Sequence, residues 1–243
     1  MTKEIIMIHG WGTQAYNSSV SLAKNKPDIA WKDRQVLVKQ LAKKYPLRFF
    51  NLPGFCGVGE PKKKFFDLED FSNYLDKWLK FQGITPLAIV GYSFGGAVAL
   101  DYKVRFRSKS RIILVSPALK RRDSLKSIIG RLAKNLVPPK YTKTLKSLYQ
   151  SLFSTYYHEG STFLRKSYDK IVRRDTRSQL TKVLPEDMLL VFGNSDTSTP
   201  YDYVSSIVKR NKLNCTIIPG GDHNIGETHP RLVSSAIIRF LSK

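Results

Sequence analysis

The sequence has few of the residues that build disulfide frameworks or metal sites. It contains two cysteines, Cys56 and Cys215, and four histidines among 243 residues. Two cysteines are too few for a disulfide framework, and their spacing is not that of a metal site. We therefore expect two reduced thiols and no bound metal.

Long hydrophobic runs are also missing. No stretch approaches the roughly 20 apolar residues that a membrane span requires. The first residues lack the apolar run and the small-residue cleavage site of a signal peptide, so we expect a cytoplasmic protein with no transmembrane segment. The length and the 42% hydrophobic content suffice for one sizeable core but not for a second full domain.

Acidic residues are scarce relative to basic ones. The chain has 19 aspartates and glutamates against 41 lysines and arginines, a formal net charge of +22. Residues 118–184 alone hold 16 basic and 4 acidic side chains. Such a surplus attracts anions, acidic proteins, nucleic acid or anionic lipid. It also fits an organism whose proteins are all rich in lysine, in which case the charge has no specific function. Both interpretations stay open.

Short apolar runs that end in turn residues predict buried parallel strands. Amphipathic helical patterns lie between them, and this alternation predicts an α/β fold with a mostly parallel sheet of about six strands and helices on both faces. The predicted strands are Glu4–Ile8, Leu47–Leu52, Leu87–Val90, Arg111–Val115, Met188–Phe192 and Cys215–Ile218. The predicted helices cover Trp31–Lys44, the stripe from Phe71 to Leu79, Gly95–Arg105 and Pro230–Leu241.

The alternation is interrupted once, over residues 118–184. Apolar residues there keep a helical period with no strand-like run, in stripes over Leu125–Leu136, Leu145–Tyr156 and Leu164–Val172. We predict a helical cap at 118–184 above the edge where open α/β sheets bind ligands, inserted into a core formed by residues 1–117 and 185–243.

A serine occupies the expected turn between a strand and a helix. Gly91-Tyr92-Ser93-Phe94-Gly95 follows the strand Leu87–Val90 and opens the helix that begins near Gly95. A sharp turn of this kind strains the backbone, exposes the hydroxyl and requires small neighbours, which glycine supplies. Ser93 is the predicted nucleophile.

A serine nucleophile needs an imidazole base that is oriented by a carboxylate. His223 follows the last predicted strand, and Asp196 follows the strand Met188–Phe192, so both lie at the same sheet edge as Ser93. Asp222 is adjacent to His223, which makes the side-chain geometry awkward, and Asp187 precedes its strand. We predict Asp196 as the acid.

Two backbone donors must hold the negative oxygen of the reaction intermediate. The fold can supply the N–H groups of Phe94, which follows Ser93, and Trp11, in the loop after the first strand. We also expect substrate contacts from Tyr92, Phe55 and His9, and a loop-shaping role for His9.

These segments carry a family resemblance over nearly the whole chain outside the cap. The motifs are His9-Gly10-Trp11-Gly12, Leu52-Pro53-Gly54-Phe55, Gly91 to Gly96, Gly193 with Asp196 and Pro200, and His223 with Pro230. In this order they resemble the capped α/β-hydrolase superfamily, most of all its small serine carboxylesterases, which include pimeloyl-carrier-protein methyl ester esterases. The resemblance implies the same triad and the same oxyanion donors.

The leading hypothesis is hydrolysis of a small-molecule carboxylic ester or lactone through an acyl-enzyme, with no cofactor. An alternative keeps the triad and docks an ester carried by an acidic acyl carrier protein on the basic cap. Its contacts would be Lys120, Arg121, Arg122, Arg173 and Arg174. A non-catalytic binder of nucleic acid, or of anionic membrane through the helix Leu125–Leu136, is the third reading. We do not expect it, because a binder has no use for a nucleophile, acid and histidine in this chain order.

Overall fold

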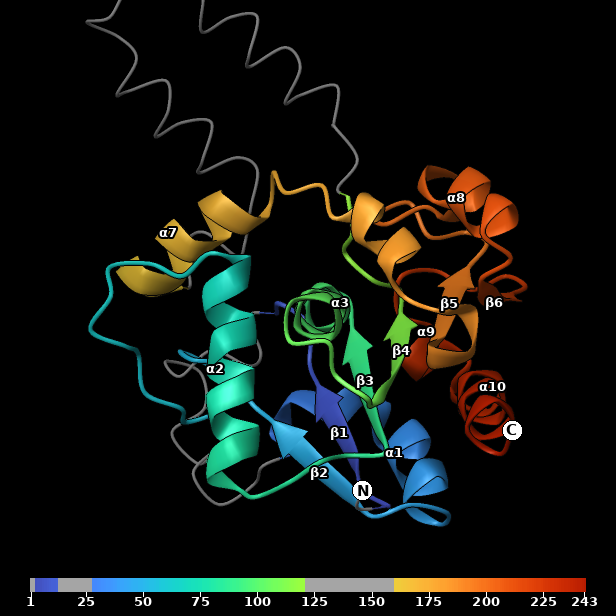
Figure 1. Cartoon of the computed structure of the whole chain (residues 1–243), viewed down its shortest axis with the longest axis horizontal. Helices are drawn as coiled ribbons and strands as arrows, with labels where there is room; N and C mark the ends of the chain where they lie inside the picture. The colour runs from blue at the N-terminus through green and yellow to red at the C-terminus, as the bar shows by residue number, and fades with distance from the viewer. Residues whose placement is uncertain (1–2, 13–27, 121–159) are drawn as a thin grey trace, which may run out of the picture.

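The computed structural model describes residues 3–12, 28–120 and 160–243, and its centre is a six-stranded parallel sheet (Figure 1). The strand order is β2-β1-β3-β4-β5-β6, and every neighbouring pair is parallel. The predicted α/β fold is therefore confirmed. The strands are β1 Ile5–Ile8, β2 Leu47–Phe50, β3 Ala88–Tyr92, β4 Arg111–Val115, β5 Met188–Gly193 and β6 Asn214–Ile218.

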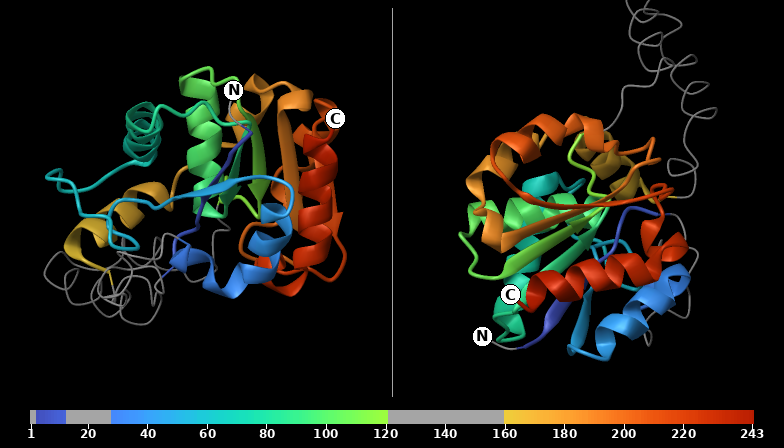
Figure 2. Two further views of the ribbon diagram at one scale, coloured as in Figure 1. Left: turned by 90° about the horizontal axis from the view of Figure 1, so that it is seen from below. Right: turned by 90° about the vertical axis from the view of Figure 1, so that its right-hand side faces the viewer.

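Helices cover both faces of the sheet (Figure 2). Helices α2 (Leu68–Phe81) and α3 (Phe94–Arg105) pack on one face, and α1 (Gln35–Ala42) and α10 (Pro230–Leu241) pack on the other. Because successive strand residues point to opposite faces, a strand covered on both sides must be apolar at every position. All four residues of β1 are fully buried, alternately in the two cores.

Local sequence explains how the helices begin. Asp67 caps α2: its carboxylate accepts the Asp70 N–H, and the Asp70 carboxylate accepts the Asp67 N–H, each at 3.0 Å. The segment predicted as one helix over Trp31–Lys44 folds instead as a 3-10 helix, Ile29–Arg34, followed by α1. Over so few residues the apolar periods of the two helix types are too similar to be distinguished in sequence.

Part of the predicted cap lies within the described residues. Its third apolar stripe forms helix α7, Thr162–Ile171, whereas the stripes over Leu125–Leu136 and Leu145–Tyr156 lie outside the described residues. The 3-10 helix Arg177–Lys182 contacts α3: Leu180 is fully buried, and the Gln179 amide donates to the Asp101 carboxylate at 3.0 Å. The end of the predicted cap thus contributes to the core beside the sheet, and the cap boundary stays a prediction.

The strand order places a switch point between β1 and β3. The chain moves from β1 to β2 on one side and returns to β3 on the other, and the carboxyl ends of strands at such a switch point are where open α/β sheets bind ligands. Loops of the other strands reach the same edge. The remaining described elements are the 3-10 helices Pro185–Asp187 and Tyr201–Tyr203, α8 Ser205–Arg210 and α9 Ile225–Thr228.

Candidate active site

Ser93 lies on a strained turn at this switch point, between the end of β3 and the start of α3. Its backbone has φ 51° and ψ −114°, in the positive-φ region that residues other than glycine rarely adopt. Such a conformation costs about 1–3 kcal/mol and persists only where the surroundings impose it. Here the Ser93 N–H donates to Val115 O at 2.9 Å, and Ser93 O accepts the Gly96 N–H at 3.0 Å.

The glycines around Ser93 are required by close backbone contacts. A Cβ on Gly91 would lie 2.3 Å from Gly95 O, and a Cβ on Gly95 would lie 2.4 Å from Ile8 O. Both distances are far below a van der Waals contact, and the groups that would have to move are backbone. The Gly-x-Ser-x-Gly pattern therefore reflects how tightly the turn packs against itself and against β1.

The structure brings the three predicted site residues into one hydrogen-bonded line. His223 Nε2 lies 3.0 Å from Ser93 Oγ, and His223 Nδ1 lies 2.8 Å from Asp196 Oδ2. An ionised Asp196 carboxylate can accept hydrogen bonds but cannot donate them, so we assign the imidazole proton to Nδ1, which leaves Nε2 as an acceptor facing the serine hydroxyl. Ser93 and His223 are 130 residues apart in sequence.

The Asp196 carboxylate is buried but well provided with donors. Burial by itself would raise the pKa of Asp196, but the hydrogen bond and charge of His223 and the donors of Thr199 outweigh it and hold the pKa below its ordinary value of 3.8. Asp196 Oδ1 accepts the N–H groups of Ser198 at 2.8 Å and Thr199 at 2.9 Å. Asp196 therefore stays ionised throughout the neutral range.

Thr199 is a member of this site that the sequence reasoning missed. Its hydroxyl lies 2.8 Å from Asp196 Oδ2, the oxygen that faces His223, and 3.3 Å from His223 Nδ1. The same side chain is buried and reaches Ser116 O at 3.3 Å. Its signal in sequence is a threonine three residues after a loop aspartate, a spacing typical of a local side-chain turn.

His9 is locked inside the molecule. Its Nδ1 lies 2.7 Å from Gly10 O, and its Nε2 accepts the Leu52 N–H at 3.1 Å, so both ring nitrogens are occupied by backbone. Burial lowers the pKa of His9 from 6.5 to about 4. The imidazole ties the loop after β1 to the loop after β2, which matches the predicted loop-shaping role.

Acidification should weaken the fold through His9. The unfolded chain binds a proton at His9 near pH 6.5, whereas the folded chain binds it only near pH 4. Between these values the unfolded state holds more protons, so the free energy of unfolding should fall by about 3 kcal/mol as the pH drops across this window. Denaturant unfolding at several pH values measures this loss. In His9→Gln the slope across the same window should be clearly shallower, and an unchanged slope would contradict the assignment.

The predicted oxyanion loop lies directly against Ser93. A Cβ on Gly10 would lie 3.1 Å from Ser93 Cβ, so the backbone that leads into Trp11 passes close to the serine. The Trp11 ring packs edge-on against Phe55 and Phe94, with ring centroids 5.0 and 5.4 Å apart. These contacts hold the Trp11 ring against the side chain of Phe94, the residue that follows Ser93.

The three residues that were predicted to contact the substrate are buried. His9, Phe55 and Tyr92 have exposed fractions of 2%, 0% and 2%. Within the described part of the chain they are packing residues, and the substrate contacts expected of them stay predictions. The Tyr92 hydroxyl is turned toward the backbone of the His223 loop.

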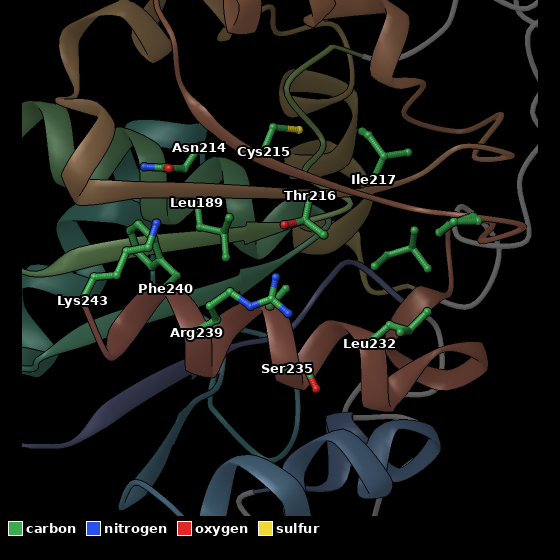
Figure 3. A pocket seen from close by; sticks show the side chains of 13 residues that line it. Leu189, Asn214, Cys215, Thr216, Ile217, Leu232, Ser235, Arg239, Phe240 and Lys243 are labelled. Atoms are coloured by element: carbon green, nitrogen blue, oxygen red, sulfur yellow. The ribbon is translucent and has the colours of Figure 1, made fainter.

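A groove of about 240 Å³ lies elsewhere, between the edge strand β6 and helix α10 (Figure 3). Its lining includes Ile217, Leu232 and Arg239 but none of the predicted site residues. Within residues 3–12, 28–120 and 160–243, no cluster of histidine, cysteine, aspartate or glutamate could hold a metal ion. No helix in that part of the chain is long and apolar enough to cross a membrane.

The strand order and the strained turn between β3 and α3 define a doubly wound α/β protein with a serine on a sharp strand-to-helix turn. The sequence pattern of the Alpha/beta hydrolase family matches residues 5–236, and the chain belongs to this family. A search of curated protein sequences found no match.

Solved structures share the fold at low sequence identity. A bromoperoxidase from Bacillus anthracis has 17% identity and a TM-score of 0.69, covering 100% of this chain and 93% of its own. An esterase from Exiguobacterium antarcticum has 17% identity and a TM-score of 0.66, covering 99% and 92%. A meta-cleavage product hydrolase from Pseudomonas fluorescens has 16% identity and a TM-score of 0.68, covering 100% and 91%. These likenesses concern the fold.

Proposed function

We propose that this protein is a serine hydrolase that cleaves small carboxylic esters or lactones through an acyl-enzyme. The observation that carries the proposal is the line Ser93–His223–Asp196, with gaps of 3.0 and 2.8 Å. Membership of the Alpha/beta hydrolase family and the esterase and hydrolase among the similar folds support it.

In this mechanism His223 Nε2 takes the hydroxyl proton as Ser93 Oγ attacks the acyl carbon. The N–H groups of Trp11 and Phe94 hold the oxyanion, and Asp196 stabilises the imidazolium. The imidazolium then gives its proton to the leaving alcohol. Water attacks the acyl-enzyme with His223 again as base, which releases the acid and restores Ser93. No step needs a cofactor.

Covalent labelling tests the proposal directly. The purified protein is treated with a fluorophosphonate probe and digested, and the adduct is located by mass spectrometry. A single adduct on Ser93, with loss of p-nitrophenyl ester hydrolysis in proportion to labelling, is expected. A protein that neither reacts with the probe nor hydrolyses any member of an ester, lactone and thioester panel would end the proposal.

An acidic carrier protein docked on the basic cap is the second candidate, and the observation in its favour is the 16 basic and 4 acidic residues of 118–184. Arg121 and Arg122 lie outside the described residues. Lys120 Nζ lies 3.9 Å from Asp175 Oδ2, and Arg174 pairs with Glu69, while Arg173 is exposed. Because two of these contacts already have carboxylate partners in this chain, the small ester remains the leading substrate.

Ionic strength separates the two candidates. For an ester on an acidic carrier protein, raising the salt from about 0.05 to about 0.5 M should lower kcat/KM roughly tenfold or more, because salt screens the attraction that steers the partners together. A small neutral ester shares the chemistry but lacks the charge, so its kcat/KM should stay nearly constant. Equal salt dependence for both substrates would remove the carrier hypothesis.

A further inference from the structure

Tyr92 connects the two halves of the candidate site, because it precedes Ser93 in the chain and its hydroxyl contacts the backbone of His223. It is the last residue of β3, immediately before Ser93, and its side chain is almost fully buried. The guanidinium of Arg34 covers the ring, with its central carbon 4.3 Å from the centroid, and Trp31 packs against it edge-on at 6.1 Å. The ring is therefore held on more than one side and has little freedom to rotate.

The Tyr92 hydroxyl connects to the loop that carries His223. It donates to His223 O at 2.7 Å and accepts the Gly226 N–H at 3.3 Å. Burial raises the pKa of the Tyr92 phenol above its ordinary value of 10.0, so the group keeps the proton that it donates. One side chain beside the nucleophile thus binds the backbone of the base itself, 131 residues further along the chain.

The loop is also packed directly against the ring. A Cβ on Gly226 would lie 2.9 Å from Tyr92 Cε2 and 3.2 Å from Arg34 Cδ. In addition, Arg34 Nη2 donates to Asn224 Oδ1 at 3.2 Å. Asn224 and Gly226, which both follow His223 in the chain, therefore contact the Tyr92–Arg34 pair, which leaves the His223 carbonyl little room to shift.

We propose that Tyr92 is a positioning residue that sets the distance between His223 Nε2 and Ser93 Oγ by holding the backbone carbonyl of His223. The proposal rests on the hydrolase function above and assigns Tyr92 a role other than substrate contact. A proton transfer across 3.0 Å is sensitive to small displacements of the base, and a shift of about 1 Å can cost on the order of 10²-fold in rate. A substrate never needs to touch the phenol for this effect.

Tyr92→Phe tests the proposal because it removes only the hydroxyl and keeps the packed ring. We expect kcat to fall about 10- to 100-fold while KM changes by less than about twofold, since transition-state geometry is lost and ground-state binding is not. The rate of Ser93 labelling by the fluorophosphonate probe should fall by a similar factor. Tyr102→Phe is the matched control, because Tyr102 is also a buried tyrosine but belongs to the core on the other face of the sheet.

The outcomes distinguish this inference from the proposed function. If the unaltered protein hydrolyses esters and labels at Ser93, but Tyr92→Phe matches Tyr102→Phe in kcat and labelling rate, the positioning role is wrong and the hydrolase function stands. A rise in KM with unchanged kcat would instead identify Tyr92 as a substrate contact and overturn the inference. If the unaltered protein neither labels nor hydrolyses, the proposed function itself has failed. Melting temperatures of the two variants show whether either loss comes from unfolding.

Discussion

Ser93→Ala should lower kcat/KM for a p-nitrophenyl ester by about 10⁴-fold or more, because the mutant has no oxygen that can form the acyl-enzyme. The remaining activity would come from binding and from the oxyanion donors acting on water. The fold should survive the change, since alanine keeps the Cβ and only the hydroxyl is lost. The strain at φ 51° remains in the mutant, so its melting temperature should lie close to that of the unaltered protein.

Steady-state kinetics with the same ester measure this loss, and Ser206→Ala provides the control. Ser206 lies exposed on α8 and does not belong to the hydrogen-bonded line Ser93–His223–Asp196. Its variant should retain full activity. Wild-type turnover by Ser93→Ala in a preparation free of contaminating esterase would rule out the proposed mechanism.

Asp196→Asn should lower kcat by roughly 10³- to 10⁴-fold and leave KM nearly unchanged. The side chain keeps its size, but its amide nitrogen can face His223 Nδ1 as a donor. The imidazole proton then moves to Nε2, so the nitrogen that faces Ser93 at 3.0 Å can no longer accept the hydroxyl proton. The loss thus arises from the wrong tautomer of a correctly placed ring.

The matched control for this change is Asp222→Asn, the neighbouring carboxylate in the His223 loop. Asp222 is exposed, and its carboxylate accepts the Asn224 N–H at 2.8 Å rather than facing the imidazole. Near-full activity is expected of this variant. Should Asp222→Asn be the damaging change and Asp196→Asn the harmless one, the acid of the site would have to be reassigned.

The Ser93→Ala and Asp196→Asn variants test the proposed reaction, whereas the His9 titration tests the stability of the fold. In the proposed mechanism Ser93 attacks the substrate and Asp196 acts through His223, whereas His9 affects the stability of the loops after β1 and β2. Because the pKa of Asp196 lies below 3.8 and that of His9 near 4, neither group changes charge in the folded protein between pH 5 and 8. Over that range the contribution of His9 to the loss of stability on acidification comes from its protonation in the unfolded chain.

Much of the fold could be predicted because it rests on local patterns. Fully apolar runs such as Ile5–Ile8 identify strands buried on both faces, and helical spacing identifies α2 through Phe71, Leu75 and Leu79. The predicted and observed strands agree to within one or two residues at their ends. Most of the 3-10 helix Ile29–Arg34 was predicted as part of an α-helix, since the apolar periods of the two helix types cannot be distinguished over so few residues.

The candidate site could be predicted for a related reason. In a parallel sheet all strands end at the same edge, so residues that follow β3, β5 and β6 must gather there. That rule was enough to choose Asp196, after its strand, over Asp187, before it. It does not predict the partners of a side chain within the loops, and the Thr199 hydroxyl beside Asp196 was therefore missed.

By itself, then, the amino-acid sequence determined the order of the strands along the chain, the serine turn and the three residues that meet at the sheet edge, because each depends on local periodicity or on which end of a strand a loop follows. Only the tertiary structure decided how those loops are held. The Leu52 N–H on His9 Nε2 and the Tyr92 hydroxyl on His223 O are contacts between segments far apart in sequence. No local pattern encodes such contacts, because they exist only once the two segments have packed together.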